Sequence, residues 1–187
     1  MFNLETERLT IRNWLISDVG AYMVLAKDVG YHGFSPPGRF IVQSQDEARE
    51  KIRERMELYE TQKLGKFPIF LKETEEFIGT CGLEPFDLNG RTEVELGYRL
   101  CLDHWGKGYA TEAAGAVLQY GFCELGCARI MAFVLRQNRA SVRILENLGF
   151  ESMGEIVHGG LPHRLYEFAR GRFRDGNSTQ AGNPAGL

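Results

Sequence analysis

The stretch HWGKGYATEAAG, from His104 to Gly115, decides how the middle of this 187-residue chain folds. Two glycines, Gly106 and Gly108, flank Lys107, and small residues typical of a helix follow. The first N–H groups of a helix have no intrahelical partner, and the helix dipole favours negative charge beside them. A loop without bulky side chains leaves room for a phosphate to approach those amides. The stretch therefore predicts either a tight turn capped by Thr111 or a binding site for an anion.

The spacing of the glycines does not match the two best-known phosphate-binding motifs. The P-loop pattern GxxxxGK[ST] is absent, because Lys107 precedes Gly108 and neither Ser nor Thr follows the lysine. The dinucleotide fingerprint GxGxxG fails too, since Thr111 stands in the place of the third glycine. Glu112 is ordinary in a first helical turn, but its charge would repel a phosphate unless the carboxylate pointed away. Spacing alone therefore leaves the turn and the anion site as alternatives.

On both sides of this stretch, the pattern of apolar residues predicts an alternation of strands and helices. Strands are predicted at 9–13, 67–72, 77–82, 93–100, 128–135, 150–156 and 164–169, and helices at 17–28, 44–64, 106–125 and 138–148. Ser44 and Glu47 form a capping-box pattern, and Gly149 is placed to end the last helix. The order predicts one mixed α/β domain at residues 1–170. The Gly-, Asn- and Ser-rich end at 171–187 predicts a disordered tail.

Composition narrows the class of protein. Hydrophobic residues make up 43% of the chain, and 22 basic against 25 acidic residues give a net charge of -3, which argues against nucleic acid as the main partner. The charged start has no signal-peptide pattern, and no apolar run approaches the roughly 18 residues of a membrane span. The four cysteines lack CxxC spacing and the histidines lack metal-ligand spacing. We expect a cytoplasmic protein with no metal, nucleic-acid or membrane partner, either a monomer or a homodimer.

Five patches together resemble the GNAT superfamily of acetyl-CoA-dependent N-acetyltransferases, and especially its ribosomal-protein N-terminal acetyltransferase branch. The glycine stretch resembles the family signature R/Q-x-x-G-x-G/A, with tryptophan in the first place. The patches are Glu5-Thr-Glu-Arg-Leu9, Glu95-Leu-Gly-Tyr98, Trp105-Gly-Lys-Gly-Tyr-Ala110, Asn138-Arg-Ala-Ser141 and Asn147-Leu-Gly-Phe150. The resemblance covers about residues 3–170. It implies one central, mostly antiparallel sheet of about seven strands, splayed in the middle, with about four helices packed on both faces.

The resemblance also implies acetyl-CoA as co-substrate, with its diphosphate held by the amides of the glycine loop. The cofactor-binding residues carried over in this way are Tyr98, Arg99, Leu100, Trp105, Gly106, Lys107, Gly108, Tyr109, Ala110, Thr111, Asn138 and Ser141. An amide between Tyr98 and Leu100 is expected to polarise the thioester oxygen.

Two carboxylates, Glu95 and Glu93, are candidates to accept the proton of the attacking amine or to orient a water that does so. They share a face if the strand is regular, and a solvated glutamate is the alternative role for Glu95. Leu145 stands where many family members carry a tyrosine as the acid. The ribosomal-protein branch suggests a serine instead, so Ser141 is expected to hydrogen-bond the leaving sulfur, with an ordinary first-turn residue capped by Asn138 as the alternative.

The chain is thus expected to be an N-acetyltransferase that moves an acetyl group from acetyl-CoA to a primary amine by direct attack in a ternary complex. A protein N-terminal α-amine is one candidate acceptor, and a small-molecule amine is the other. The expected acceptor-binding residues are Tyr31, Phe34, Glu93 and Glu95. A non-catalytic acyl-CoA-binding sensor is an alternative function, which the leucine at position 145 keeps open.

Overall fold

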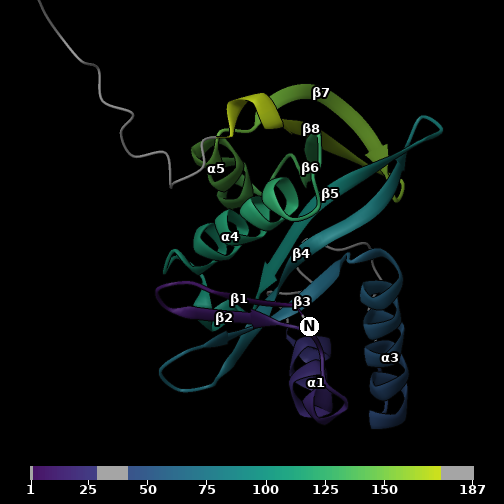
Figure 1. The fold of residues 1–187 in the computed structure, drawn as a ribbon, viewed down its shortest axis with the longest axis vertical. Coiled ribbons are helices and arrows are strands. Elements are labelled where there is room, and N and C mark those ends of the chain that lie inside the picture. Colours follow the sequence, from purple (N-terminus) through teal and green to yellow (C-terminus); the bar gives the residue numbers. More distant parts are fainter. Residues whose placement is uncertain (1, 29–41, 174–187) are drawn as a thin grey trace, which may run out of the picture.

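An open sheet of eight strands forms the centre of the molecule (Figure 1). The computed structural model describes residues 2–28 and 42–173. The strands are β1 (Asn3–Glu5), β2 (Leu9–Arg12), β3 (Gly65–Leu71), β4 (Phe77–Leu88), β5 (Arg91–Leu100), β6 (Arg129–Leu135), β7 (Glu151–His158) and β8 (Leu161–Ala169). They lie in the order β1-β2-β3-β4-β5-β6-β8-β7, and all neighbours are antiparallel except β5 and β6. The predicted mixed α/β fold is confirmed, with eight strands rather than about seven.

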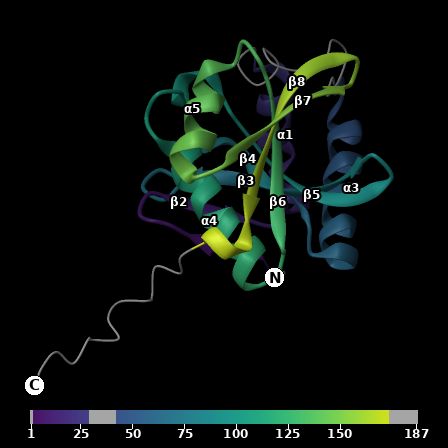
Figure 2. The same cartoon turned by 90° about the horizontal axis from the view of Figure 1, so that it is seen from above.

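Helices cover both faces of this sheet. Those in the described residues are α1 (Val19–Lys27), α3 (Gln45–Gln62), α4 (Tyr109–Cys123) and α5 (Arg139–Leu148), with short 3-10 helices η1 (Ile16–Asp18), η2 (Leu102–His104) and η3 (Arg170–Arg172). Helices α4 and α5 lie on one side of the sheet (Figure 1, Figure 2), and α1 and α3 contact each other on the opposite side. No helix within residues 2–28 and 42–173 is both long enough and apolar enough to cross a membrane.

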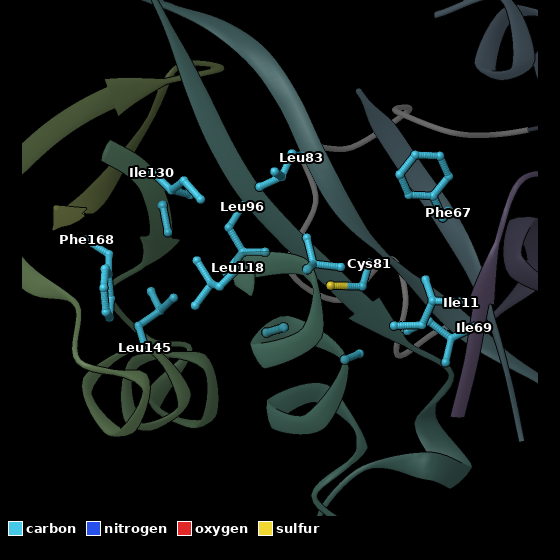
Figure 3. Packing of buried hydrophobic residues seen from close by; sticks show 14 of the residues in the cluster. Ile11, Phe67, Ile69, Cys81, Leu83, Leu96, Leu118, Ile130, Leu145 and Phe168 are labelled. Carbon is cyan, nitrogen blue, oxygen red and sulfur yellow. The ribbon is translucent and has the colours of Figure 1, made fainter. Parts of the chain in front are cut away.

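The main core lies between the sheet and α4. Leu83 and Leu96 of β4 and β5 point toward Leu118 of α4 (Figure 3), and all three side chains are buried. Gly121 lets the helix approach closely, because a Cβ there would lie 2.6 Å from Ile130 Cδ1. Ala113 and Ala114 of the glycine stretch are also fully buried in this core. They hold α4 against the sheet and fix where its first turn stands.

Three helix ends test the capping predictions. Ser44 Oγ accepts from the amide of Glu47 at 3.2 Å as predicted, but the Glu47 carboxylate accepts from Gln43, one residue before the expected amide. Asn138 caps α5 and Gly149 ends it in a left-handed conformation with φ of 95°, so both of those predictions are confirmed.

The start of α1 has no side-chain cap. Asp18 occupies the cap position, but its carboxylate accepts hydrogen bonds from Arg12, at 2.7 and 2.9 Å, and from the amide of Leu15, at 2.8 Å. The side chain therefore ties the helix back to β2 instead of capping it. An ion pair between residues six apart carries no local sequence signature, which is why this arrangement was not predicted.

The sheet divides between β5 and β6. These two parallel strands share a single residue pair, Glu95 with Met131. On its other edge β5 pairs with β4 along its whole length, and β6 pairs with β8 from Arg129 to Leu135. Beyond the pair Glu95–Met131 the two halves of the sheet separate, so the expected splay lies immediately after Glu95.

Packing continues slightly past the predicted domain boundary at residue 170. The ring of Phe173 lies 4.9 Å from that of Phe122 in α4, measured between centroids. The rest of the predicted tail, from residue 174 on, lies outside the described residues.

Candidate active site

A cavity of about 650 Å³ opens where β5 and β6 separate. The predicted site residues that line it are Glu95, Tyr98, Arg99, Leu100, Trp105, Gly106, Gly108, Tyr109, Ala110, Thr111, Asn138 and Ser141. The structure therefore brings together patches that are up to 46 residues apart in sequence, from Glu95 on β5 to Ser141 on α5. Lys107 and Glu93 are not among the lining residues, and Tyr31 and Phe34 lie outside the described residues.

Glu93 shares a strand face with Glu95, as expected for a regular strand, but it is not among the residues that line the cavity. Its carboxylate accepts a hydrogen bond from Arg129 Nε at 3.0 Å, and the same guanidinium also binds Glu167. The hydrogen bond from Arg129 outweighs burial and lowers the pKa of Glu93, so the side chain stays ionised in this ion pair. Arg129 thus binds the carboxylate of Glu93, the other candidate for the base.

The glycine loop presents backbone amides without side-chain caps. Gly106 and Gly108 have φ of 73° and 84°, a left-handed conformation that favours glycine. Gly108 is the cap residue of α4, and no side chain hydrogen-bonds to that helix start, so the alternative in which Thr111 caps the helix does not apply. Within the described part of the chain, the amides of residues 106–110 donate to no protein oxygen. Five successive donors therefore remain available at the positive end of a helix dipole.

Glu112 points away from this loop because the β1–β2 turn binds its carboxylate. Oε1 accepts from Thr6 Oγ1 at 2.6 Å and from the amide of Arg8 at 2.9 Å, while Oε2 accepts from Arg8 Nε at 2.7 Å. Burial alone would raise the pKa of Glu112, but these hydrogen bonds outweigh it and lower the pKa, so the carboxylate is ionised. Its charge is neutralised by Arg8, which removes the repulsion that the sequence suggested.

Arg8 also contacts the loop itself. Its Nη1 donates to the carbonyl oxygen of Lys107 at 3.0 Å, and its guanidinium lies 4.6 Å from the centroid of the Tyr109 ring. The patch Glu5-Thr-Glu-Arg-Leu9 could be quoted from the sequence but not given a role. The structure shows that Thr6 and Arg8 hold the glycine loop and the first turn of α4 in place, and we call these contacts the N-terminal clamp.

The cavity reaches both faces of the sheet. Along β5, Tyr98 and Leu100 belong to the core on the α4 side, so the alternating residues Glu95, Gly97 and Arg99 face the α1–α3 side. The glycine loop and the start of α5 lie on the α4 side. We call the α4 side of the cavity, which holds the residues expected to bind the acyl donor, the donor half, and the side of Glu95, expected to face the amine, the acceptor half.

Ser141 of α5 lines the donor half of the cavity. Its amide donates to Asn138 Oδ1 at 3.1 Å, and its carbonyl accepts from the Tyr98 hydroxyl at 3.3 Å. Burial raises the pKa of the Tyr98 phenol well above its usual range, so this hydroxyl stays protonated. Among the described residues, nothing hydrogen-bonds the Ser141 hydroxyl, which is available to a ligand. Leu145 is buried beside Phe168 (Figure 3) and offers no proton.

In the acceptor half, Glu95 is only 9% exposed and lies near a lysine. Lys66 Nζ is 2.9 Å from Glu84 Oε2, and a Cβ on Gly97 would lie 2.5 Å from Lys66 Cε and 3.4 Å from Glu95 Oε1. Gly97 therefore leaves the space through which Lys66 crosses β5. Burial would lower the pKa of Lys66, but the charges of Glu95 and Glu84 outweigh it and raise the pKa, so the ammonium remains charged.

Several lining residues were not predicted from the sequence. Among them are Lys66, Glu84, Phe86, Phe133, His158 and His163. The two histidines meet because β7 and β8 continue to a two-residue turn at Gly159 and Gly160, both with positive φ, where the predicted strands stopped short. A Gly-Gly pair between apolar runs is a hairpin signal that would have indicated this contact. In residues 2–28 and 42–173, no cluster of three or more His, Cys, Asp or Glu side chains is arranged to hold a metal.

Comparison with known proteins matches residues 8–151 to the Acetyltransferase (GNAT) domain family. The chain belongs to the GNAT acetyltransferase family. This acetyltransferase is 37% identical over 176 residues to the N-acetyltransferase p20 of Bacillus licheniformis. The aligned region covers 94% of this chain and 93% of the relative. The family resemblance inferred from the five patches is therefore confirmed.

Solved structures share the fold of this acetyltransferase. The ribosomal-protein-S5-alanine acetyltransferase from Vibrio fischeri superposes with a TM-score of 0.75 at 20% identity, covering 94% of this chain and 100% of that one. A ribosomal L7/L12 α-N-protein acetyltransferase in complex with coenzyme A superposes with a TM-score of 0.77 at 18% identity, covering 90% and 98%. The GNAT family uses acetyl-CoA, and the chain is an acetyltransferase enzyme.

Proposed function

We propose that this enzyme transfers the acetyl group of acetyl-CoA to a primary amine by direct attack while both substrates are bound, and that an α-amine is its preferred acceptor. The observation that carries the proposal is the row of amides at residues 106–110, which lack protein partners and border the cavity. A diphosphate fits such a helix start, because backbone N–H groups and the helix dipole both favour an anion there. Acetyl-CoA supplies the acetyl group as a thioester.

The residues of the donor half have separate tasks in this proposal. Amides between Tyr98 and Leu100 border the gap beyond the Glu95–Met131 pair, where they can polarise the thioester oxygen. The Ser141 hydroxyl hydrogen-bonds the leaving sulfur. A hydroxyl is a weak acid at neutral pH, so Ser141 stabilises the developing charge on sulfur without transferring its proton completely.

In the acceptor half, Glu95 takes the proton of the amine, directly or through a water. Lys66 offsets the negative charge of Glu95, so the pair attracts a strongly cationic acceptor less than an isolated carboxylate would. An α-amine has a pKa near 8, so about a tenth of it is neutral at pH 7, against less than about 0.1% of a lysine side chain. An acceptor that is partly neutral needs little help from a base. The fold likeness to the two ribosomal-protein acetyltransferases also favours an α-amine.

Gly108→Val tests the binding site for acetyl-CoA. The valine would have to adopt φ near 84°, and its Cβ would stand 3.3 Å from Arg8 Nη2 in front of the amides. We expect calorimetry to show at least about a hundredfold weaker acetyl-CoA binding, because branched side chains are strained at this φ and obstruct the anion. Gly126→Val is the matched control, since Gly126 has φ of 68° with no neighbour within 4 Å. Equal affinity in Gly108→Val and wild type would refute the loop assignment.

Two alternatives make different predictions for thiol release. A sensor domain would bind acetyl-CoA and release no free thiol with any amine. An enzyme for small-molecule amines would release thiol with metabolite amines and not with peptide N-termini. Release with peptide α-amines and not with lysine side chains or polyamines supports the proposed function.

A further inference from the structure

Four rings form one wall of the acceptor half. Phe86 of β4 and Phe133 of β6 have centroids 5.6 Å apart. Phe133 in turn lies 4.2 Å from the ring of His158 and 5.5 Å from that of His163. All four side chains line the cavity. None of them has a role in the donor half or in the proton transfer assigned to Glu95.

Strand pairing places this wall on the same face as Glu95. Glu95 pairs with Glu84 on β4, two residues before Phe86, and with Met131 on β6, two residues before Phe133. Since β5 lies between β4 and β6, the contact of the two phenylalanine rings crosses over β5 close to Glu95. The rings therefore border the part of the cavity next to Glu95, where they can contact the body of a molecule whose amine approaches this carboxylate.

His163 adds a hydrogen-bond acceptor to the wall. The residue is 7% exposed, and its Nδ1 lies 2.9 Å from the carbonyl oxygen of Leu161. A carbonyl only accepts, so Nδ1 carries a hydrogen, and the tautomer with its hydrogen on Nδ1 alone presents a lone pair at Nε2. Within the described residues Nε2 has no partner, and it is not sealed off from the cavity. The ring is thus held in one tautomer with its acceptor nitrogen open to a ligand.

The opposite wall carries balanced charges. Its ionisable residues are Glu84, Glu95, Lys66 and Arg99. A polyamine needs a carboxylate for each ammonium group, but Lys66 already binds Glu84 at 2.9 Å. The rings, in contrast, offer flat apolar surface that an aromatic or aliphatic body can cover. The acceptor half therefore favours one amine on an apolar body over several amines on a chain.

We propose that Phe86, Phe133, His158 and His163 form the acceptor subsite, that it takes a primary monoamine carried on an aromatic or other flat apolar body, and that Nε2 of His163 accepts a hydrogen bond from an N–H of this acceptor. The inference rests on the proposed function, because it presumes that the amine reaches Glu95. It narrows the α-amine class to molecules or chain ends whose first side chain is aromatic or apolar.

The test compares phenylalanine amide, glycine amide and 1,4-diaminobutane as acceptors for the full-length enzyme, with thiol release as the readout. We expect kcat/KM for phenylalanine amide to exceed that of either other amine by about tenfold or more, as one well-packed aromatic contact provides. Phe133→Ala should remove most of this preference by raising the KM for phenylalanine amide. His163→Phe keeps a ring but loses Nε2, and should raise the KM about tenfold for phenylalanine amide and glycine amide alike.

Val157→Ala is the matched control, because Val157 lies on the same hairpin and is 78% exposed. It should match the wild type with all three amines. Acetyl-CoA affinity, measured by calorimetry, should be unchanged in every variant, which shows that each one is folded. Equal kcat/KM for the three amines, a preference for diaminobutane, or no acetylation of phenylalanine amide overturns the inference. If wild type also fails to bind acetyl-CoA, the proposed function fails with it.

Discussion

Glu95 occupies the residue pair at which the sheet divides, and its surroundings limit what it can do. It is 9% exposed, pairs with Met131 across the parallel junction, and shares its face with the lysine that crosses at Gly97. The carboxylate is therefore held at the junction between the donor and acceptor halves. A carboxylate at this point can accept the proton of an amine in the acceptor half while that amine attacks a thioester in the donor half.

Replacing Glu95 tests this role. We expect Glu95→Gln to lower kcat about tenfold to a hundredfold, at the low end of general-base effects, because an α-amine is already partly neutral at pH 7. The measurement is kcat between about pH 6 and pH 9. Glu93→Gln is the matched control, since it removes a carboxylate two residues away that binds Arg129 outside the cavity, and it should leave kcat near that of wild type. Unaltered turnover of Glu95→Gln over this range would exclude Glu95 from the mechanism.

At single positions, the sequence was most informative where local chemistry decides the conformation. Gly149 ends its helix in the left-handed conformation that its placement suggested, and Asn138 caps that helix. Gly106 and Gly108, expected only to leave the loop without side chains, also have positive φ. Lys66 and Arg8 could not be predicted, because each acts through partners that only the fold brings close. Lys66 can lie over β5 only because Gly97 has no side chain there, and the sequence analysis assigned Gly97 no role.

At the level of elements, the N-terminal clamp links the β1–β2 turn to α4. The turn lies more than 100 residues from Glu112 in sequence, yet its residues Thr6 and Arg8 bind that carboxylate. The β1–β2 turn thus neutralises the carboxylate that would otherwise repel an anion at the start of α4. Because the Arg8 side chain is 44% exposed, solvent screening weakens the ion pair, so we expect its effect on anion binding to be modest.

The clamp predicts a rescue. Arg8→Ala should weaken acetyl-CoA binding about threefold to tenfold, since an uncompensated carboxylate then stands in the first turn of α4. The double variant Arg8→Ala/Glu112→Gln should recover most of the affinity, because the repelling charge is gone. Calorimetry with coenzyme A measures both. Arg12→Ala is the matched control, as Arg12 pairs with Asp18 away from the loop. A double variant as weak as Arg8→Ala would contradict the clamp's electrostatic role.

The bounds of the strands and helices show which elements can be located from the sequence pattern. The helix at α4 and the strands around it were placed from periodicity, which is strong in buried elements. The three-residue strand β1 was missed because it is too short to show alternation, and β4 runs six residues beyond its predicted end at residue 82. The splay itself was implied by the family resemblance, since nothing in the residues of β5 or β6 shows where pairing stops.

At the scale of the molecule, the cavity joins two faces of one sheet. The donor half holds the glycine loop and α5, and the acceptor half holds Glu95 and the four rings. At the junction, an acetyl group can pass directly from a donor to an acceptor without forming a covalent bond to the protein. No cysteine lines the cavity in the described part of the chain, so no thiol nucleophile of the protein stands at this junction.

This arrangement predicts sequential kinetics. Initial rates measured over a grid of acetyl-CoA and acceptor concentrations should give double-reciprocal lines that intersect, because both substrates must be bound before transfer. Parallel lines would indicate an acetylated enzyme and would contradict direct attack. As a second readout, enzyme incubated with acetyl-CoA alone should gain no acetyl group by mass spectrometry.

The single pair Glu95–Met131 also has a thermodynamic consequence. The backbone ladder joins the two half-sheets at this one residue pair, next to the side-chain contacts Arg129–Glu93 and Phe86–Phe133. A ligand bound in the opening would contact the strand edges that have no ladder partner there. Whatever occupies that seam in the folded chain and not in the unfolded one adds its binding free energy to the stability of the fold. Ligand occupancy and the integrity of the sheet are in this way one coupled equilibrium.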